Sequence, residues 1–104
     1  MRKVIDGKVY DTKTADFVCD ISPPGSNRGD FRFEDTGLYK SPKGTFFIAG
    51  EGGPLSRWAQ AEGQNGRRSG EGLQLLEIEA AKVLCQQHGS VEDFTEAFGE
   101  PEPG

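Results

Sequence analysis

The sequence predicts an α+β fold: a small antiparallel β-sheet of about four to five strands in the N-terminal part, packed with about two to three short helices in the C-terminal half. Two turn signals, Asp6-Gly7 and Ser41-Pro42-Lys43-Gly44, predict β-hairpins in the first half of the chain. After Leu76, apolar residues recur at helical spacing. The 104 residues fit one domain, which we expect to span 1–99, followed by a flexible acidic tail at 100–104.

The β segments up to Ala49 are expected to pair antiparallel with their neighbours in sequence, because their connections are too short for a parallel crossover. The first two flank Asp6-Gly7, a dipeptide that favours a type I′ turn because both central residues take positive φ. The third runs from Asp16 to Ile21, and its alternation predicts that Phe17 and Cys19 point inward. Later, Phe31-Arg32-Phe33-Glu34 alternates with both Phe side chains on one face.

The stretch from Leu38 to Trp58 is predicted to organise the fold. Its segments 38–40 and 45–49 form a hairpin, in which Pro fixes φ at the second turn position and Gly closes the turn. The glycine-rich run 50–53 is then interpreted as the joint where the chain leaves the sheet. Pro54 suits the first turn of a helix, which is expected to run through Leu55, Trp58 and Ala59.

The C-terminal half is expected to begin without regular structure, because 61–72 is rich in glycine and almost free of apolar residues. The segment 73–76 is a short strand or an extended lead-in. A helix follows from about residue 77 and ends at Gly89. Its predicted apolar stripe comprises Ile78, Ala81, Leu84 and Cys85. Ser90 to Asp93 resembles a capping box at the start of a last helix, whose expected inward residues are Val91, Phe94, Ala97 and Phe98.

Charge is distributed unevenly along the chain. The net charge is −5, but residues 1–50 sum to +1 and residues 51–104 sum to −6. The last carboxylates, which have no basic residue among them, are Glu92, Asp93, Glu96, Glu100 and Glu102. This end of the chain therefore disfavours non-specific nucleic-acid binding and suits a basic partner surface, with Glu92, Asp93 and Glu96 as candidate partner-binding residues.

Targeting and cofactor signals are weak. No apolar run approaches the ~18 residues that cross a bilayer, and Met1-Arg2-Lys3 leads into a hairpin, so we expect a soluble intracellular protein without membrane contact. Cys19 and Cys85 form neither a disulfide framework nor a metal set, and we expect two reduced core thiols. Phosphate-binding glycine motifs are absent. We expect neither a metal nor a cofactor.

Catalytic candidates are few. His88 follows Cys85 by one helical turn, which permits a Cys/His dyad, but Cys85 lies on the apolar stripe and His88 suits a helix C-terminus through the dipole. The sequence therefore predicts a protein that is not an enzyme. Glu51, flanked by glycines, has two open interpretations: an accessible functional carboxylate, or a structural residue that forms an ion pair or a helix-entry contact.

Two further candidates concern binding. Arg67 and Arg68 lie in the glycine-rich stretch and suit bidentate contacts with phosphate or carboxylate, although a solvated loop is the simpler interpretation. Trp58 suits an interface hot spot, but a lone Trp on an amphipathic turn more often closes the core of a small domain.

Short motifs spread over most of residues 4–85 form a distinctive pattern. They are Val4 to Thr12 with Thr14-Ala15, Asp30-Phe31, Leu38-Tyr39, Lys43-Gly44 with Phe46-Phe47, and Gly50 to Ser56 with Ala59, completed by a final helix rich in Glu and Ala. In these motifs the chain resembles small proteins of phages and integrated mobile elements.

This resemblance implies an accessory protein in the cytoplasm of a bacterial host. Small acidic proteins of such elements include anti-CRISPR inhibitors, which bind and block a CRISPR effector. The expected function is therefore inhibition of such an effector through acidic surfaces. The alternative is a small nucleic-acid-binding or regulatory module that uses Arg28, Arg32, Arg67 and Arg68.

Overall fold

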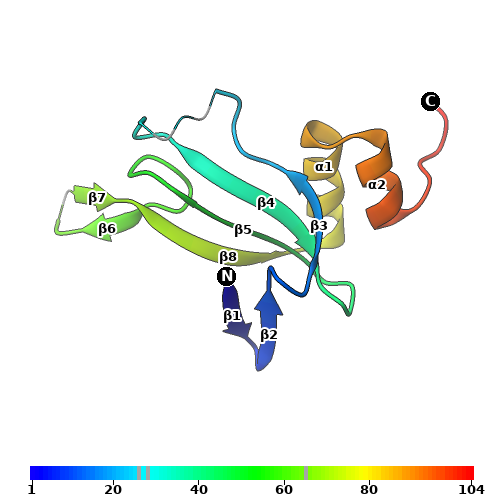
Figure 1. The fold of residues 1–104 in the computed structure, drawn as a ribbon, viewed down its shortest axis with the longest axis horizontal. Coiled ribbons are helices and arrows are strands. Elements are labelled where there is room, and N and C mark those ends of the chain that lie inside the picture. Colours follow the sequence, from blue (N-terminus) through cyan, green and yellow to red (C-terminus); the bar gives the residue numbers. More distant parts are fainter. Residues whose placement is uncertain (26, 28, 65) are drawn as a thin grey trace.

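The chain folds into strands followed by two helices, which confirms the α+β class (Figure 1). A computed structural model describes residues 1–25, 27, 29–64 and 66–104. The elements in chain order are β1 (Arg2–Ile5), β2 (Lys8–Asp11), β3 (Asp16–Asp20), β4 (Glu34–Lys40), β5 (Phe46–Gly52), β6 (Gln60–Glu62), β7 (Gly66–Arg68), β8 (Gly70–Leu76), α1 (Ile78–His88) and α2 (Val91–Phe98).

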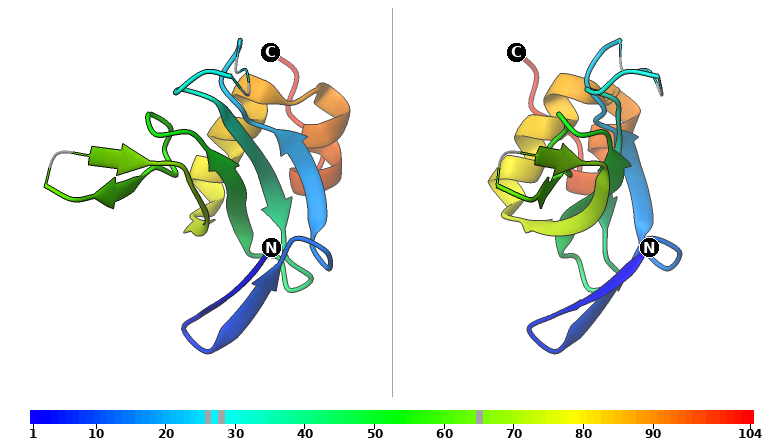
Figure 2. Two further views of the ribbon diagram at one scale, coloured as in Figure 1. Left: turned by 60° about the vertical axis from the view of Figure 1, so that its left-hand side comes forward. Right: turned by 90° about the vertical axis from the view of Figure 1, so that its left-hand side faces the viewer.

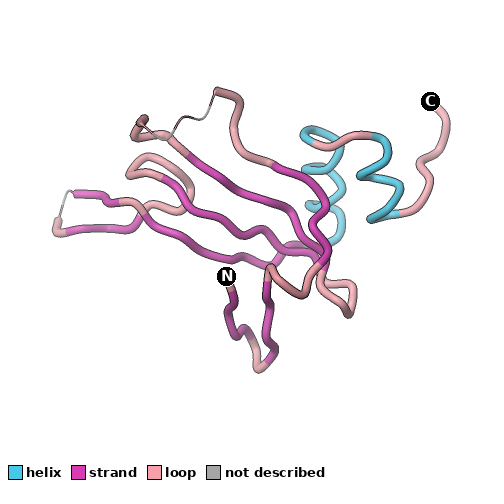
Figure 3. The backbone as a smooth tube through the Cα atoms, viewed as in Figure 1, coloured by secondary structure: helices cyan, strands magenta, loops and turns pink. Residues whose placement is uncertain are grey.

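The centre of the fold is a four-stranded antiparallel sheet with the order β3-β4-β5-β8. Both helices cover one face of this sheet (Figure 2). Two separate two-stranded ribbons, β1–β2 and β6–β7, extend away from it (Figure 3). After α2, residues 100–104 are exposed and have no regular secondary structure.

The predicted hairpins form where local turn chemistry favours them. Asp6 and Gly7 join β1 to β2 with φ values of 52° and 78°, the left-handed pair that a type I′ turn requires. Strands β4 and β5 pair over their whole length, and their turn is closed by the N–H of Ser41 donating to the carbonyl of Thr45 at 2.8 Å. This hairpin supplies the two central strands of the sheet.

The predicted helix after Pro54 is wrong. Strand β5 continues to Gly52, and residues 53–59 form consecutive turns. The Ser56 hydroxyl donates to the Gly53 carbonyl at 2.8 Å and accepts from the Trp58 N–H at 3.2 Å, while the Leu55 N–H donates to the Phe31 carbonyl. These side-chain and long-range hydrogen bonds take the place of the hydrogen bonds of a helix. Serine favours this outcome because its hydroxyl can bond nearby backbone groups.

The absence of structure expected between 61 and 72 is also wrong, since β6, β7 and the start of β8 lie there. Gly63 turns the β6–β7 ribbon with φ 67°, a value that glycine adopts without strain. The ribbon is held by backbone pairing, and all its side chains are exposed. A ladder of this kind leaves no hydrophobic pattern in the sequence.

Two hydrophobic clusters lie on the two faces of the sheet. The helix-side cluster contains Val18, Cys19, Ile21, Leu38, Phe46, Ile48, Trp58, Ala81, Cys85 and Ala97. The opposite cluster contains Tyr10, Phe47, Ala49 and Leu73, with Met1, Ile5, Ala15, Tyr39 and Leu75 packed against it. The β1–β2 ribbon therefore covers part of the face that the helices leave open.

Several predicted inward side chains point outward. Phe17 is 60% exposed because a β-bulge between Phe17 and Cys19 shifts the alternation of β3. The β segment expected at 31–34 is also wrong, since β4 begins only at Glu34, and Phe31 is exposed. Ile78 and Val91, the first residues of their helices, are exposed as well.

The helix signals themselves are confirmed. Ser90 and Asp93 form the predicted capping box at the start of α2, and Gly89 follows the last residue of α1 with extended backbone. Of the helices in the described part of the chain, none is long and apolar enough to cross a membrane.

Candidate protein-binding surfaces

Trp58 lies in the core, where it supports the sheet from the helix side. Its side chain is 8% exposed, and its indole N–H donates to the hydroxyl of Thr36 at 2.8 Å. The ring lies over Gly72, where a methyl group would meet Cε3 at 2.7 Å. The core interpretation of Trp58 is therefore confirmed, and its polar atom is used within the chain.

A buried carboxylate continues this network. Glu34 is 4% exposed, its Oε2 lies 2.8 Å from Nε of Arg57, and the Thr36 hydroxyl donates to the same oxygen at 2.7 Å. The backbone N–H of Arg57 also donates to Oε1 at 3.4 Å. These contacts tie the turns 53–59 to β4, so the rigid end of the sheet is built from residues that are distant in sequence.

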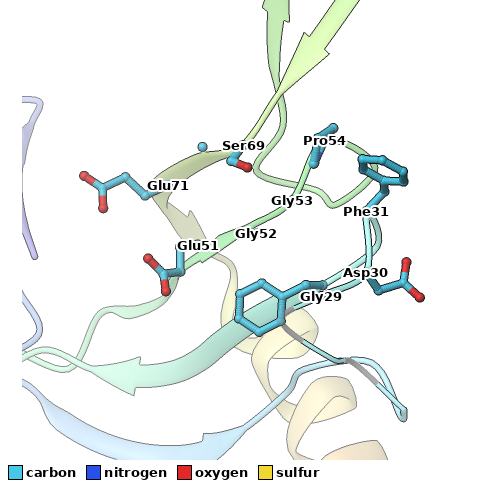
Figure 4. A pocket seen from close by; sticks show the side chains of 11 residues that line it. Gly29, Asp30, Phe31, Glu51, Gly52, Gly53, Pro54, Ser69 and Glu71 are labelled. Atoms are coloured by element: carbon cyan, nitrogen blue, oxygen red, sulfur yellow. The ribbon is translucent and has the colours of Figure 1, made fainter.

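Three carboxylates lie in one line on the other face. Asp35, Glu51 and Glu71 are direct cross-strand partners on β4, β5 and β8, and we call them the acidic row. Directly opposed residues share a face, and Figure 4 shows the side chains of Glu51 and Glu71 pointing the same way. Like charges directly opposite one another on neighbouring strands repel, and the row gathers negative charge on this face of the sheet.

A hollow of about 650 Å³ adjoins the acidic row (Figure 4). Gly52, Gly53 and Gly70 contribute backbone to its lining, and Phe31, Phe33 and Pro54 contribute apolar surface. Glu51 and Glu71 lie along one side of it. Glu51 is thus a strand residue beside a hollow, and the helix-entry interpretation of this residue is wrong because no helix begins there.

An exposed aromatic side chain lies at the β3 edge. The Phe17 ring packs edge-on against Tyr39 with centroids 5.5 Å apart, and Tyr39 stacks on Phe47 at 5.3 Å. Burial, and then the charges of Asp35 and Asp20, raise the pKa of Tyr39. The exposed ring is therefore anchored on a rigid aromatic stack surrounded by negative charge.

Phe17 lies between two further hollows of about 230 and 360 Å³. Their carboxylates are Asp20, Asp35 and Glu51 on one side, and Asp16, Asp93 and Glu96 on the other. We call Phe17 together with these six residues the Phe17 surface. Bonds from the side chain and backbone of Ser22 lower the pKa of Asp20, so this carboxyl keeps its charge under mildly acidic conditions.

The predicted acidic residues of α2 fall partly on this surface. Asp93 and Glu96 line the larger hollow, whereas Glu92 is exposed and does not. Asp93 also accepts a bond from the N–H of Ser90 at 2.9 Å, which fixes its position. Lys40, which lines the same hollow, donates to the Ala97 carbonyl at 3.1 Å and thereby caps the end of α2.

The arginine candidates lie elsewhere. Arg67 and Arg68 are exposed on the β6–β7 ribbon, opposite Ala61 and Gln60. Neighbouring residues of a strand point to opposite faces, so the two guanidinium groups do not form one cluster. Arg32 is exposed in the turn before β4, and Arg28 lies outside the described residues.

The residues of the catalytic hypothesis are not brought together. Cys85 is 1% exposed in the helix-side cluster, and burial raises its pKa, an effect that the nearby thiol of Cys19 partly offsets. Burial likewise raises the pKa of Cys19 to about 12. Both thiols are free and buried, as predicted. Glu51 lies on the other face of the sheet, and His88 is exposed at the end of α1.

Metal binding gains no support either. Over the residues that the structure describes, no three His, Cys, Asp or Glu side chains are placed to share a metal ion. The acidic row is extended across three strands, which spreads its charge over a surface.

Sequence reasoning missed Phe17, Asp35 and Glu71 as surface residues. The alternation in Gly70-Glu71-Gly72-Leu73-Gln74-Leu75 was a usable strand signal, obscured by its glycines. The bulge that exposes Phe17 had no such signal. Comparison with known proteins finds no matching family model, curated protein or solved structure.

Proposed function

We propose that the protein is a non-enzymatic binding protein whose Phe17 surface docks on a basic surface of another protein. The observation that carries this proposal is an exposed Phe17, packed edge-on against Tyr39 between two hollows that carboxylates line. An exposed aromatic side chain that a neighbouring ring holds in place can anchor an interface, because a few such side chains carry most of the binding energy. The surrounding carboxylates add electrostatic steering toward a basic partner.

The partner class that we propose is a nucleic-acid-binding protein, and within it a CRISPR effector. Such proteins hold nucleic acid in positively charged channels, and an acidic domain that occupies the channel excludes the nucleic acid. The net charge of −5 and the resemblance to mobile-element proteins support this choice. The protein would then act as an anti-CRISPR inhibitor in the cytoplasm of a bacterial host.

The proposal is tested by measuring whether the purified protein inhibits target binding and cleavage by a panel of CRISPR effectors. We expect inhibition by the wild type, and a loss of affinity of about tenfold or more for Phe17→Ala. Glu96→Lys is expected to weaken binding and to reduce its salt dependence, because a surface charge acts mainly on association.

Matched controls use exposed residues that line neither hollow beside Phe17. Val83→Ala removes an exposed apolar side chain from α1, and Glu62→Lys reverses a charge on the β6–β7 ribbon. Both are expected to inhibit like the wild type. An absence of binding to every effector at low salt would reject the proposed partner. Equal binding by Phe17→Ala would reject the proposed surface.

The alternative is a nucleic-acid-binding module that uses the β6–β7 ribbon. This ribbon projects from the domain, its strand residues 60–62 and 66–68 are exposed, and it carries Arg67 and Arg68 (Figure 2). A two-stranded ribbon fits the major groove of DNA. Gel shifts with single- and double-stranded DNA and RNA at low salt test this alternative. Nucleic-acid binding that is weakened by Arg67→Ala and by Arg68→Ala would support it. The absence of any shift would reject it.

A further inference from the structure

The outer edge of β8 is open. β8 is the last strand of the sheet, and no hydrogen bond other than its pairing with β5 involves its backbone among the bonds of the described residues. The opposite edge strand, β3, is interrupted by its bulge and contacts both helices. A regular unpaired edge offers a row of donors and acceptors to another strand, whereas a bulged edge is protected.

The register shows which residues of β8 face outward. The bonds from the Ser41 N–H to Thr45 and from the Gly53 N–H to Phe33 show that odd-numbered residues of β4 and β5 bond each other. Even-numbered residues of β5 therefore bond the even-numbered residues of β8. The backbone N–H and C=O groups of Glu71, Leu73 and Leu75 consequently point away from the sheet.

The side chains of the same three residues define what an added strand must carry. They lie on the face that the helices leave open, with Glu71 exposed, Leu75 half-buried and Leu73 buried. Glu71 is also the outermost member of the acidic row. A cationic side chain directly opposite Glu71 would form a favourable cross-strand charge pair. Apolar side chains opposite Leu73 and Leu75 would pack against these two leucines.

We propose that the β8 edge binds an extended segment of another protein by β-strand addition. The segment runs antiparallel to β8, with Lys or Arg opposite Glu71 and apolar residues at the two alternate positions before it. A second copy of β8 does not meet this requirement: the strand contains no basic residue, and antiparallel self-pairing about Leu73 places Glu71 opposite Leu75. This binding mode does not depend on the partner of the Phe17 surface.

The probe is the acetylated and amidated heptapeptide Thr-Val-Thr-Val-Thr-Lys-Thr, whose Val and Lys residues fall opposite Leu75, Leu73 and Glu71. Binding is followed by amide chemical shifts and by hydrogen exchange of the full chain. We expect the peptide to slow exchange at the amides of residues 71, 73 and 75, while the amides of 72 and 74 are protected already. A peptide with Glu in place of Lys is expected to bind several-fold more weakly.

Two variants at one position separate backbone from charge. Glu71→Gln removes only the carboxylate and is expected to weaken binding several-fold. Glu71→Pro also removes the outward N–H and is expected to abolish binding. Proline is tolerated at an edge position whose N–H faces solvent, and circular dichroism verifies folding.

Modified peptides test the proposal even where Glu71→Pro does not fold. Methyl groups on the backbone nitrogens of the Val and Lys residues block the bonds to β8 and are expected to abolish binding. Methyl groups on the inner Thr nitrogens point away and are expected to leave binding unchanged. Equal binding of both peptides, protection outside β8, or a dimer of the free protein with β8 amides already protected would overturn the proposal.

Discussion

The indole N–H of Trp58 donates to the hydroxyl of Thr36 at 2.8 Å, and that hydroxyl in turn donates to the carboxylate of Glu34 at 2.7 Å. One hydroxyl thus joins the turns 53–59 to β4. All three side chains are buried, so each lost bond leaves a polar group without compensation by water.

Replacing Thr36 with Val is expected to lower the free energy of unfolding by about 1–3 kcal/mol, because it removes the acceptor of a buried indole N–H while keeping the shape of the side chain. Urea denaturation measures the change. Thr95→Val, at an exposed position of α2, is the control and is expected to change stability by less than about 0.5 kcal/mol. Equal effects of the two variants would contradict the network.

Gly72→Ala is expected to cost about 1–3 kcal/mol, because the new methyl group would lie 2.7 Å from Cε3 of Trp58 and the ring must shift. A change in tryptophan fluorescence of the folded state should accompany the loss. Gly104→Ala, at the exposed C-terminus where a methyl group meets nothing, should change neither signal.

Glu71→Lys is expected to stabilise the fold by about 0.2–1 kcal/mol at low salt, since it places a cation opposite Glu51 in the acidic row. Salt screens this gain. Thermal unfolding at about 0.02 M and about 0.5 M NaCl should therefore show a smaller stability difference between the variant and the wild type at the higher concentration. Glu62→Lys on the β6–β7 ribbon is the charge-matched control. A destabilised Glu71→Lys variant at low salt would show that the row is not repulsive.

Stability is expected to fall in alkaline solution. Burial, together with Cys85, raises the pKa of Cys19 from 9.0 to about 12. The unfolded thiol ionises near pH 9, whereas the folded thiol stays protonated. The contribution of Cys19 to the free energy of unfolding is therefore complete below pH 9 and is lost as the pH rises toward about 12. One such group adds a slope of about 1.4 kcal/mol per pH unit.

Cys19→Ala should reduce that slope, whatever its effect on stability at neutral pH. The pKa values of Cys85 and Tyr39 are raised as well, so the variant should still lose some stability as the pH rises. Urea unfolding under reducing conditions between about pH 8 and about pH 11 checks the difference in slope. Identical slopes for the two proteins would refute the assignment to Cys19.

Ser90→Ala is expected to destabilise the protein by about 1 kcal/mol through loss of the capping box of α2. Hydrogen exchange should then increase first at the N–H of Asp93, which Ser90 accepts at 3.1 Å. Ser69→Ala, an exposed serine outside the helices, is the control.

The parts of the fold that were predicted correctly depend on local chemistry. Asp6-Gly7 determines its turn through backbone conformation, and Ser90 and Asp93 determine a helix start within four residues. The turns after Pro54 could not be predicted in this way, because their bonds reach Phe31 and Thr36, residues that are far away in sequence.

The candidate surfaces likewise divide into a part that depends on neighbouring residues and a part that depends on residues distant in sequence. The acidity near Asp93 and Glu96 was visible in the composition of the C-terminal segment. The acidic row was not, because Asp35, Glu51 and Glu71 meet only through the register of three strands. Period-2 alternation assumes an unbroken strand, and it failed at β3 for that reason.

The bulge in β3 adds one residue, Val18, between two residues that are paired with β4. Val18 has no cross-strand partner, whereas Phe17 is paired with Tyr39 and Cys19 with Leu38. Removing Val18 would therefore preserve both pairings, at the expense of one buried side chain. A deletion at this position would therefore shorten β3 while Phe17 stays exposed and Cys19 stays buried.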